Sequence, residues 1–517
     1  MNIPDIPIGT LLPDHVDPDS LVNLPRRQTL ASRWRGDSWS DFKDDLGRAG
    51  VALSENLTDR RRFETDAGGV AFGLPQALVR GTSAETVSTV LKAAQRHRVP
   101  VTARGGGLTT EGESVAYGGV LLDMSAMSRV VHVDTAQMTV RTEAGIFWHH
   151  LAEALRPYGL DYLSAPLNLT SSVGGTIGVG GIDINSPKFG CSADQVVAMQ
   201  VVTPKGKIVE CSETVHRELF ERVLLGYGQF GVITEATLMI RPYTPISMHY
   251  FYYGSLETAI EDMQKLVVAD AADYCAILTI IDKAINLLVA FDTDDREQAF
   301  FANWAPALKG SSELVFGMKT AAHYALRPWR LKEALFLLNR RLELFPDFYL
   351  PEYMKDGKIL DRSVVFSRAV WKHWGGKQMV IPDLATNAEK FTEAVVRGNK
   401  VCRKYFPYYT LYCVGIKIRN GLDRYELSSI PPDANDFAYG CEFEPMLFDK
   451  IYSRDTLQSF KNEIYDIGVD MKTSYYRFGG VMKGYIRAAL GDAVVDKHLA
   501  LKRAADPAMI LNPDVIF

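Results

Sequence analysis

The chain has 517 residues, of which 47% are hydrophobic, and this is enough for a globular protein of about two to four domains. The formal net charge of −5 at pH 7 leaves no general basic field, which disfavours nucleic acid and an acidic membrane surface as partners. The six cysteines form neither a C-x-x-C pair nor a His/Cys metal spacing, so we expect reduced thiols without a zinc site or a disulfide framework.

The N-terminal residues, up to about 65, are rich in charge and proline, and we expect an irregular arm there with one or two short helices. They do not begin with a basic end followed by an apolar run, the pattern of a secretory signal. No window of the chain approaches the roughly eighteen uncharged apolar residues of a membrane span. These features predict a soluble, cytoplasmic protein.

A βαβ unit is expected from residue 76 onward. QALVRG predicts a strand, SAETVSTVLKAAQRH a helix, and VPVTARG a second strand. We expect Thr82 to be the N-cap of the helix, because Glu85 follows it by three residues as in a capping box. The second strand runs directly into three consecutive glycines, Gly105 to Gly107.

The segment after the glycines predicts mostly short strands with period-two alternation. A helix is expected at FWHHLAEALRPYG, and a second glycine-rich stretch follows at SSVGGTIGVGGID. VVAMQVVTPKGKIVEC predicts a hairpin that turns at Pro204, Lys205 and Gly206. Pro242 and Pro245 mark a boundary, after which strands and helices alternate to about residue 470, and the chain ends with a helix at AVVDKHLALKRAA and an apolar, strand-like tail.

The consecutive glycines suit a diphosphate. Because glycine has no Cβ, successive backbone N–H groups can converge on one anion, and Thr109 and Thr110 add hydroxyls. A tight turn is the alternative interpretation. Neither a Rossmann nor a Walker loop fits, because no periodic helix follows directly and Gly-Lys-Ser/Thr is missing. The second glycine-rich stretch favours a long dinucleotide.

The order of these segments resembles the FAD-linked oxidases of the vanillyl-alcohol oxidase, or PCMH-type, superfamily, with the cytokinin dehydrogenase group as the nearest likeness. The resemblance is dense over 70–242 and 500–517. It implies an α+β fold: a two-part FAD-binding PCMH-type domain with an inserted α+β substrate cap. The expected divisions are an arm at 1–65, the FAD-binding domain at 66–242, the cap at 243–473 and a returning segment at 474–517. The segments that carry the likeness are VRGTSAETVSTVLKAAQRHRVPVTARGGGLT, GGVLLDMSAM, SVGGTIGVGGI, FGCSADQVVAMQVVTPKGKIVEC, GYGQFGVITEATL and DPAMILNPDVIF.

The resemblance also implies which residues bind FAD. Those around the first glycines would hold the pyrophosphate, those of the second stretch would line the cofactor, and the returning chain would cross the flavin. In chain order they are Arg104, Gly105, Gly106, Gly107, Leu108, Thr109, Ser172, Thr176, Gly178, Ile182, Ile233 at the adenine end, Lys483, Tyr485 and Asn512.

Two departures from the cytokinin dehydrogenase pattern bear on the chemistry. Leu108 stands where that group has the histidine that carries the flavin, so we expect FAD to be bound without a covalent bond. Leu167 stands where the group has its catalytic aspartate, so cytokinin is a disfavoured substrate and another residue must take the proton. We interpret Cys191 as a small buried hydrophobic residue and not as a second flavin link.

Candidates for the chemistry lie late in the chain. Tyr476 and Arg477 resemble the Tyr-Arg pair that binds phenolate in the phenol oxidases of the superfamily, and arginine offers a planar pair of donors. In YYTLYCVGIKIRN, Tyr408 and Tyr412 share one strand face and form either an aromatic wall over a substrate or ordinary core packing. Glu442 is a candidate base, with Glu444 on the same face, whereas His149 and His150 are interpreted as structural.

The resulting functional hypothesis is an FAD-dependent oxidoreductase. It would transfer a hydride from an activated C–H of a small alcohol, amine or phenolic substrate to flavin N5, and then pass electrons to oxygen or another acceptor. The alternatives are a non-oxidase flavoenzyme that acts reductively or without net redox change, and an electron-relay flavoprotein. The sequence leaves open whether the protein forms a homodimer.

Overall fold

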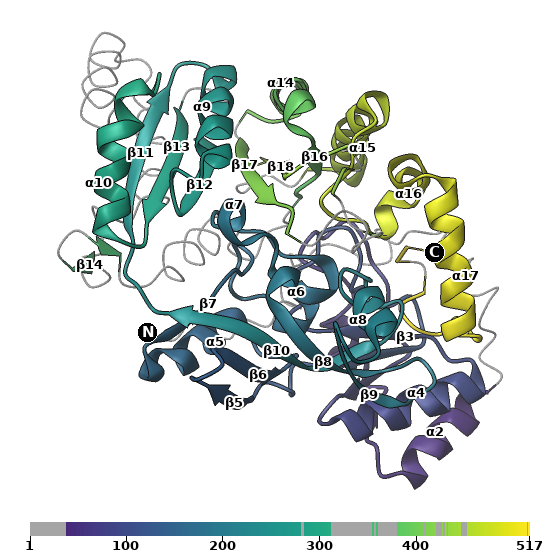
Figure 1. Cartoon of the computed structure of the whole chain (residues 1–517). Helices are drawn as coiled ribbons and strands as arrows, with labels where there is room; N and C mark the ends of the chain where they lie inside the picture. Colours follow the sequence, from purple (N-terminus) through teal and green to yellow (C-terminus); the bar gives the residue numbers. More distant parts are fainter. Residues whose placement is uncertain are drawn as a thin grey trace.

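Three β-sheets and the helices packed on them make up most of the part of the chain that the structure, a computed structural model, describes (Figure 1). The described residues are 38–280, 284–311, 354–355, 358–359, 380–407, 409–419, 427, 430–431, 433–445, 452–513 and 515–516.

The first sheet contains the predicted βαβ unit. Strands β2 (Ala77–Arg80) and β3 (Val101–Arg104) both pair in parallel with β4 (Val120–Asp123), and α4 (Ala84–His97) connects β2 to β3. The short β1 (Leu53–Ser54) adds an antiparallel edge to β2, so the strand order is β1-β2-β4-β3. The two predicted strands and the helix between them are confirmed.

The N-cap of α4 differs from the prediction. Ser83, not Thr82, adopts the extended cap conformation, and its Oγ accepts a hydrogen bond from Thr86 N at 3.2 Å. Thr82 instead places its hydroxyl 3.2 Å from that of Thr86. Both residues are good caps, and the local backbone decided between them.

The second sheet is antiparallel, and its first strand follows the last strand of the first sheet along the chain. The predicted hairpin is confirmed as β8 (Val196–Val202) and β9 (Ile208–Ser212), with Gly206 at a φ of +74° in its turn. The long β10 (Val232–Pro242) pairs with β8, with β6 (Thr139–Glu143) and, at its end, with β7. The order is β5-β6-β10-β8-β9, with β5 at Val130–Asp134 and β7 at Leu160–Tyr162.

The third sheet comes from the region after Pro242. It is antiparallel, in the order β11-β13-β12-β17-β18-β16. Helices α9 (Leu256–Val268) and α14 (Ala388–Tyr405) pack on one face, and α15 (Arg454–Met471) packs against α14 (Figure 1). The strands are β11 (Ser247–Tyr253), β12 (Tyr274–Ile280), β13 (Ala284–Phe291), β16 (Asp383–Thr386), β17 (Tyr409–Lys417) and β18 (Phe437–Pro445).

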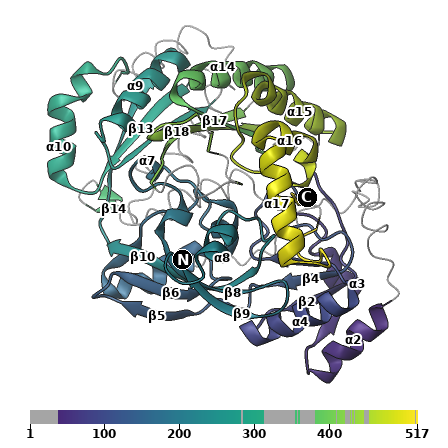
Figure 2. The same cartoon turned by 45° about the vertical axis from the view of Figure 1, so that its right-hand side comes forward.

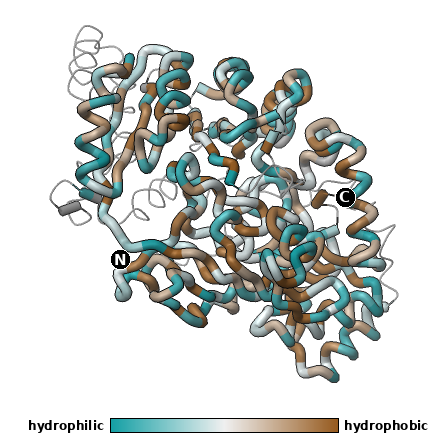
Figure 3. Tube along the Cα trace, in the orientation of Figure 1, coloured by the Kyte–Doolittle hydropathy of each residue, from teal (hydrophilic) through white to brown (hydrophobic). Residues whose placement is uncertain are grey.

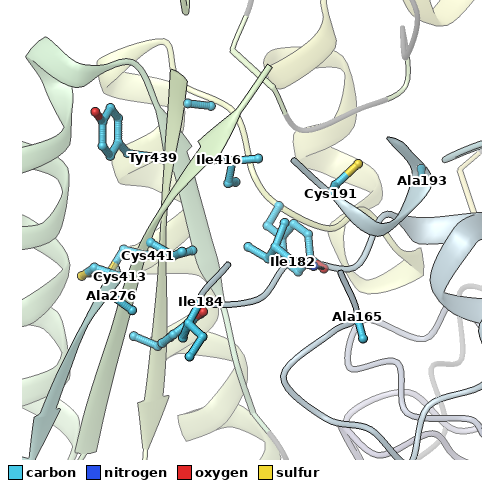
Figure 4. Close-up of a cluster of buried hydrophobic side chains, with 14 of the residues drawn as sticks. Ala165, Ile182, Ile184, Cys191, Ala193, Ala276, Cys413, Ile416, Tyr439 and Cys441 are labelled. Carbon is cyan, nitrogen blue, oxygen red and sulfur yellow. Dashed lines mark hydrogen bonds between the residues drawn. The ribbon is translucent and has the colours of Figure 1, made fainter. Parts of the chain in front are cut away.

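The other face of the third sheet meets the chain that follows the second glycine-rich stretch. The short helix α7 (Ser186–Phe189) packs on β12 and β17, and Cys275 N donates to Ile184 O at 2.9 Å. Figure 4 shows Ile182 and Ile184 beside the strands that carry Cys413 and Cys441. One cluster of buried hydrophobic side chains continues from the second sheet into the third, and Figure 3 shows hydrophobic stretches along their inner strands.

The C-terminal segment returns to the first two sheets, which the C-terminal end of α17 (Asp492–Ala505) approaches (Figure 2). The buried ammonium of Lys502 donates to Gln229 O at 2.6 Å and to Leu511 O at 2.8 Å. The strand-like tail forms a single parallel bridge, Val101 with Leu511, and not a strand. A left-handed residue, Asn512, turns the chain there.

The other described elements are shorter or peripheral. Among the described helices, none combines the length and apolar character that a membrane span requires. The arm contributes α2 and α3 within its described residues. The bounds are α2 (Trp39–Arg48), α3 (Leu57–Arg61), α5 (Trp148–Leu155), η3 (Arg156–Tyr158), α6 (Val173–Val179), η4 (Ser192–Gln195), α8 (Arg217–Val223), α10 (Asp294–Asn303), η5 (Ala305–Ala307), β14 (Met354–Lys355), β15 (Lys358–Ile359), η10 (Gly480–Met482) and α16 (Lys483–Leu490).

Candidate functional site

One cavity extends from the two glycine-rich stretches to the third sheet. Strand β10, the C-terminal tail and the segment after α15 complete its walls. Of the residues expected at the site, those that line the cavity are Arg104, Gly105, Gly106, Gly107, Leu108, Thr109, Ser172, Thr176, Gly178, Ile182, Ile233, Tyr412, Glu442, Tyr476, Arg477 and Asn512.

Tyr485 is the exception. It lies on α16, where its hydroxyl donates to Asp466 Oδ1 at 3.0 Å and its ring packs near Tyr465 and Tyr475. It is not part of the cavity wall, and the cofactor contact of Tyr485 stays a prediction. Tyr408 and the side chain of Lys483 lie outside the described residues.

The first glycines are required by close contacts. A Cβ on Gly105 would collide with the side chain of Ser172, whose Oγ accepts from Gly106 N at 3.4 Å. Gly107 has a φ of +68°, and a Cβ there would overlap the Arg104 guanidinium. The two glycine-rich stretches therefore touch, and side chains at these positions would separate them.

The glycine loop is held from behind by buried polar groups. Asp66 Oδ2 accepts from Thr109 Oγ1 at 2.9 Å and from Gly112 N at 2.8 Å. The guanidinium of Arg104 donates to Thr65 O at 2.8 Å. Burial raises the pKa of Asp66 to about 6, although the hydrogen bond from Gly112 opposes the shift. The sequence analysis did not identify Asp66, which only the tertiary structure brings beside the loop.

The loop presents backbone donors to the cavity. Within the part of the chain that the structure describes, no group accepts a hydrogen bond from the backbone N–H of Gly107, Leu108 or Thr109. Backbone N–H groups without partners on three consecutive residues of a cavity wall fit an anionic diphosphate. The residues present therefore fit the pyrophosphate of a dinucleotide such as FAD.

The far end of the cavity is built by β17 and β18. Tyr412 lies directly opposite Glu442 in the pairing of these strands, and Glu444 follows on the same face of β18. All three side chains line the cavity. The buried hydroxyl of Tyr412 has no hydrogen-bond partner among the described residues. On the opposite face, Tyr409 donates to Asn399 Oδ1 at 2.7 Å, which confirms the predicted alternation of β17.

Arg477 is engaged by carboxylates. Its Nε lies 3.6 Å from Asp383 Oδ2, its Nη2 lies 3.5 Å from Glu442 Oε1, and it donates to Ile381 O at 3.4 Å. The neighbouring Tyr476 hydroxyl accepts from Ile182 N at 3.1 Å and so joins this segment to the second glycine-rich stretch.

Burial raises the pKa of several carboxyl groups at this end. The pKa of Asp383 rises to about 7 even though Arg477 opposes the shift. The pKa of Glu113 rises to about 8, with the Asp66 and Glu111 carboxyls adding to the effect of burial. The pKa of Glu444 is raised well above its usual value by burial and by the adjacent Glu442. Asp383 and Glu113 can therefore hold or release a proton near neutral pH.

Glu113 and Asp383 were missed by the sequence analysis. Glu113 stands only four residues beyond Thr109, and this proximity to the glycine loop was the one signal available. Asp383 lies in an unremarkable strand, and its role follows from contacts with residues far away in the chain.

The structure also locates the two residues that depart from the cytokinin dehydrogenase pattern. Leu108 and Leu167 both lie in the cavity wall. Cys191 is buried, as are the other five free cysteines, and burial raises the pKa of its thiol well above the usual value. Over the described residues, no three His, Cys, Asp or Glu side chains cluster in a way that could hold a metal ion.

Comparison with known proteins identifies the glycine-bearing region. Residues 75–212 match the FAD binding domain family. The chain is 29% identical to a D-lactate dehydrogenase of Anaerostipes hadrus, over 43% of this chain and 53% of that protein. It is 34% identical to cytokinin dehydrogenase 8 of Oryza sativa subsp. indica, over 43% and 45% respectively. It is 32% identical to the mitochondrial D-lactate dehydrogenase [cytochrome] of Arabidopsis thaliana, over 38% and 37%. The chain thus spans about half the length of the curated relatives that it matches, or less.

Proposed function

The chain carries an FAD-binding domain of the PCMH type, and from this premise we propose that the protein is an FAD-dependent oxidoreductase acting on a small alcohol, amine or phenolic substrate. The observation that supports the proposal is the continuity of the cavity. The same space that begins at the glycine loop ends at Tyr412, Glu442 and Arg477. A cofactor held at one end and a substrate held at the other would therefore share one continuous site.

The first glycines and the second stretch would hold FAD. The backbone N–H groups of Gly107, Leu108 and Thr109 would bind the pyrophosphate, and Ser172, Thr176, Gly178, Ile182, Ile233 and Asn512 would line the rest. When bound, FAD supplies an acceptor for a hydride. Because the side chain of Leu108 has no nucleophilic atom, we infer that FAD is held without a covalent bond.

The third sheet would serve as the substrate cap. Its strands β17 and β18 contribute Tyr412, Glu442 and Glu444 to the cavity wall, and a substrate bound against them would be partly shielded from water. Tyr412 and Tyr476 would flank the substrate and position its C–H bond toward the flavin. Glu442 would accept the proton of the substrate O–H or N–H. Arg477 holds Glu442 in place by the ion pair of 3.5 Å. Because Leu167 carries no proton acceptor, this carboxyl group replaces the aspartate that the related group has there.

The proposed partners are a small-molecule substrate and an electron acceptor, oxygen or another oxidant. The test is anaerobic mixing of the purified yellow protein with separate pools of alcohols, amines and phenols while the flavin absorbance is recorded. Bleaching by one pool is the expected result. The opposite outcome is that no pool bleaches the yellow protein, whereas a reduced donor reduces its flavin and a second compound is then turned over. That outcome would overturn the proposed direction of hydride transfer, from the substrate to the flavin.

Acid precipitation tests the mode of binding. Without a covalent bond, the yellow colour is expected in the supernatant once the protein has unfolded and precipitated. Colour that stays with the washed pellet would show a covalent link and contradict the inference from Leu108.

A further inference from the structure

The substrate end of the cavity carries an excess of acidic groups. Four carboxyl groups gather there, those of Glu113, Asp383, Glu442 and Glu444, and all but Asp383 are in the wall itself. Among the described residues of the wall, Arg477 is the one whose guanidinium lies beside them. The other arginine in the wall, Arg104, donates behind the glycine loop to Thr65 O at 2.8 Å.

Arg477 is poorly placed to bind an anionic substrate. Two carboxyl groups lie within 3.6 Å of its guanidinium, and Nη2 also donates to Ile381 O at 3.4 Å, whereas Nε has no hydrogen-bond partner among the described residues. An incoming carboxylate or phenolate would approach a guanidinium whose charge Asp383 and Glu442 already offset, and would lie among further carboxyl groups. Each of these groups repels an anion once it is ionised, so the arrangement disfavours anions above the raised pKa values of the carboxyls.

Two groups at this end lack an interaction that burial usually requires. Glu444, which is 6% exposed, shares a hydrogen bond with Glu442, and among the described residues no cation lies within ion-pair distance of it. The hydroxyl of Tyr412, which is 2% exposed, has no hydrogen-bond partner among the described residues, although Tyr412 lines the cavity. Buried polar groups are normally satisfied, so a carboxyl pair without a cation beside Glu444 and a hydroxyl without a partner indicate a ligand that supplies these interactions.

We propose that the end of the cavity formed by Glu442, Glu444 and Tyr412 binds the positively charged nitrogen of an amine substrate. The proposal rests on the proposed function and names the substrate class of that same site. An ammonium supplies both things that the site lacks, a positive charge beside Glu444 and N–H donors for the carboxylate and phenol oxygens. A neutral alcohol would supply only a donor, and a carboxylate would supply neither.

The site also accounts for the proton that an amine must lose. An ammonium has no lone pair, so its N–H bond must break before the adjacent C–H bond becomes a good hydride donor. The proton would pass to a carboxylate oxygen of Glu444 or Glu442, while the electron pair stays on the nitrogen. Burial raises the pKa of Glu444, which suits it to receive this proton.

The test uses three ligands that share a tert-butyl group and differ in charge: tert-butylammonium, tert-butanol and pivalate. None has a hydrogen on the carbon that bears the polar group, so none can be oxidised there and binding is measured without turnover. Each is titrated into the FAD-loaded protein, and the perturbation of the flavin absorbance gives its Kd. We expect tert-butylammonium to bind about tenfold or more tighter than either of the others.

Glu444→Gln keeps the size of the side chain and leaves both partners of Arg477 in place. It is expected to weaken tert-butylammonium by about tenfold or more and tert-butanol by less than about twofold. The control is Glu153→Gln, which removes a carboxylate from the exposed face of α5 and should change no Kd. Tyr412→Phe provides a second test if Glu444→Gln does not fold. It should also weaken the binding of tert-butylammonium more than the binding of tert-butanol.

Several outcomes would overturn the proposal. These are tighter binding of pivalate, equal weakening of all three ligands by Glu444→Gln, or no binding of tert-butylammonium to a yellow protein. In each of them the proposed oxidoreductase function would still stand, because the flavin is present and its reduction is tested separately. A colourless protein that takes up no FAD would instead overturn both.

Discussion

At the scale of single residues, the first glycine stretch shows why the absence of a side chain at one position can affect cofactor binding. The backbone at Gly105 lies so close to Ser172 that a Cβ has no room, and the pair brings two segments together that are far apart in the chain. The requirement is steric and does not depend on an unusual backbone angle at Gly105, unlike the positive φ of Gly107. FAD binding should therefore be sensitive to one added carbon.

Gly105→Ala is expected to reduce FAD affinity. The added Cβ must push Ser172 and the second glycine-rich stretch away, and overpacking of this kind costs about 1–3 kcal/mol. Flavin content after purification, and the Kd from fluorescence titration of the stripped protein, measure the effect. The matched control is Gly254→Ala, since an added Cβ at Gly254 meets no atom within 4 Å. Equal flavin content in the two variants would contradict the steric argument.

The carboxyl of Glu444 gives the site a pH dependence with a defined sign. Its pKa is raised by burial and by Glu442, so below that pKa it holds a proton and offers no charge to an ammonium. As the pH rises through this pKa the proton leaves, and the affinity for tert-butylammonium should increase. A primary ammonium keeps its own charge over this range, as lysine does. Among the described residues, the groups that interact electrostatically with Glu444 are Glu442, Arg477 and Tyr412.

The measurement is the Kd of tert-butylammonium from about pH 6 to about pH 8.5 in wild type and in Glu444→Gln. The wild-type Kd should fall as the pH rises, and the slope should be smaller in the variant. The Asp383 and Glu113 carboxyls, with pKa values near 7 and 8, account for the slope that remains. A slope of opposite sign in the wild type would exclude deprotonation of a carboxyl as the cause.

At the scale of elements, helix α15 is tied to the chain just beyond the glycine loop by one buried ion pair. The ammonium of Lys461 lies 2.5 Å from Glu111 Oε1 and donates to Thr110 O at 3.3 Å. Both side chains are 0% exposed. The pair thus connects the region of the third sheet to the FAD-binding domain at the point where the glycine loop ends. Its loss would lower both the stability of the protein and its affinity for the cofactor.

Lys461→Met should be strongly destabilising. It leaves the Glu111 carboxylate buried without its cation, and breaking such a pair costs about 3–5 kcal/mol. Denaturant unfolding measures the loss. The control is Lys265→Met, because Lys265 pairs with Glu261 on the surface with 55% of its side chain exposed, where about 0–1 kcal/mol is expected. Similar losses in the two variants would contradict the argument from burial.

At the scale of the whole molecule, the second and third sheets share one hydrophobic cluster, and the cavity has walls from both. The returning tail adds Asn512, whose Oδ1 accepts from Ala103 N at 3.0 Å and whose Nδ2 donates to Tyr227 O at 3.0 Å. A ligand that fills the cavity therefore contacts parts of the chain that unfold together, and should stabilise them as one unit.

FAD added to the stripped protein should raise the midpoint of a single thermal transition. At a free concentration of 100 times Kd the stabilisation is about 2.7 kcal/mol. ADP, which fills only the nucleotide part of the site, should bind less tightly and raise the midpoint less at equal concentration. Differential scanning calorimetry makes the comparison. Two separate transitions, of which FAD shifts only one, would show that the sheets do not unfold together.

The sequence alone determined the features that depend on neighbouring residues. The βαβ unit, the hairpin at Pro204 to Gly206 and the alternation of β17 follow from local periodicity and turn chemistry, which act over a few residues. The two glycine-rich stretches likewise identified the cofactor region, because bare backbone is visible in the chain itself. The choice of Ser83 over Thr82 as N-cap shows the limit of such local reasoning, since both residues fit the pattern.

Only the tertiary structure decided which distant groups surround one another. Asp66 behind the glycine loop, Asp383 beside Arg477 and Lys461 against Glu111 each join segments that no local pattern relates. It also placed Tyr485 outside the cavity wall, and it brought the carboxyl groups of Asp383 and Glu442 within 3.6 Å of the Arg477 guanidinium. The physical reason is that burial and charge pairing depend on the whole surrounding volume, which contacts between residues far apart in the chain create.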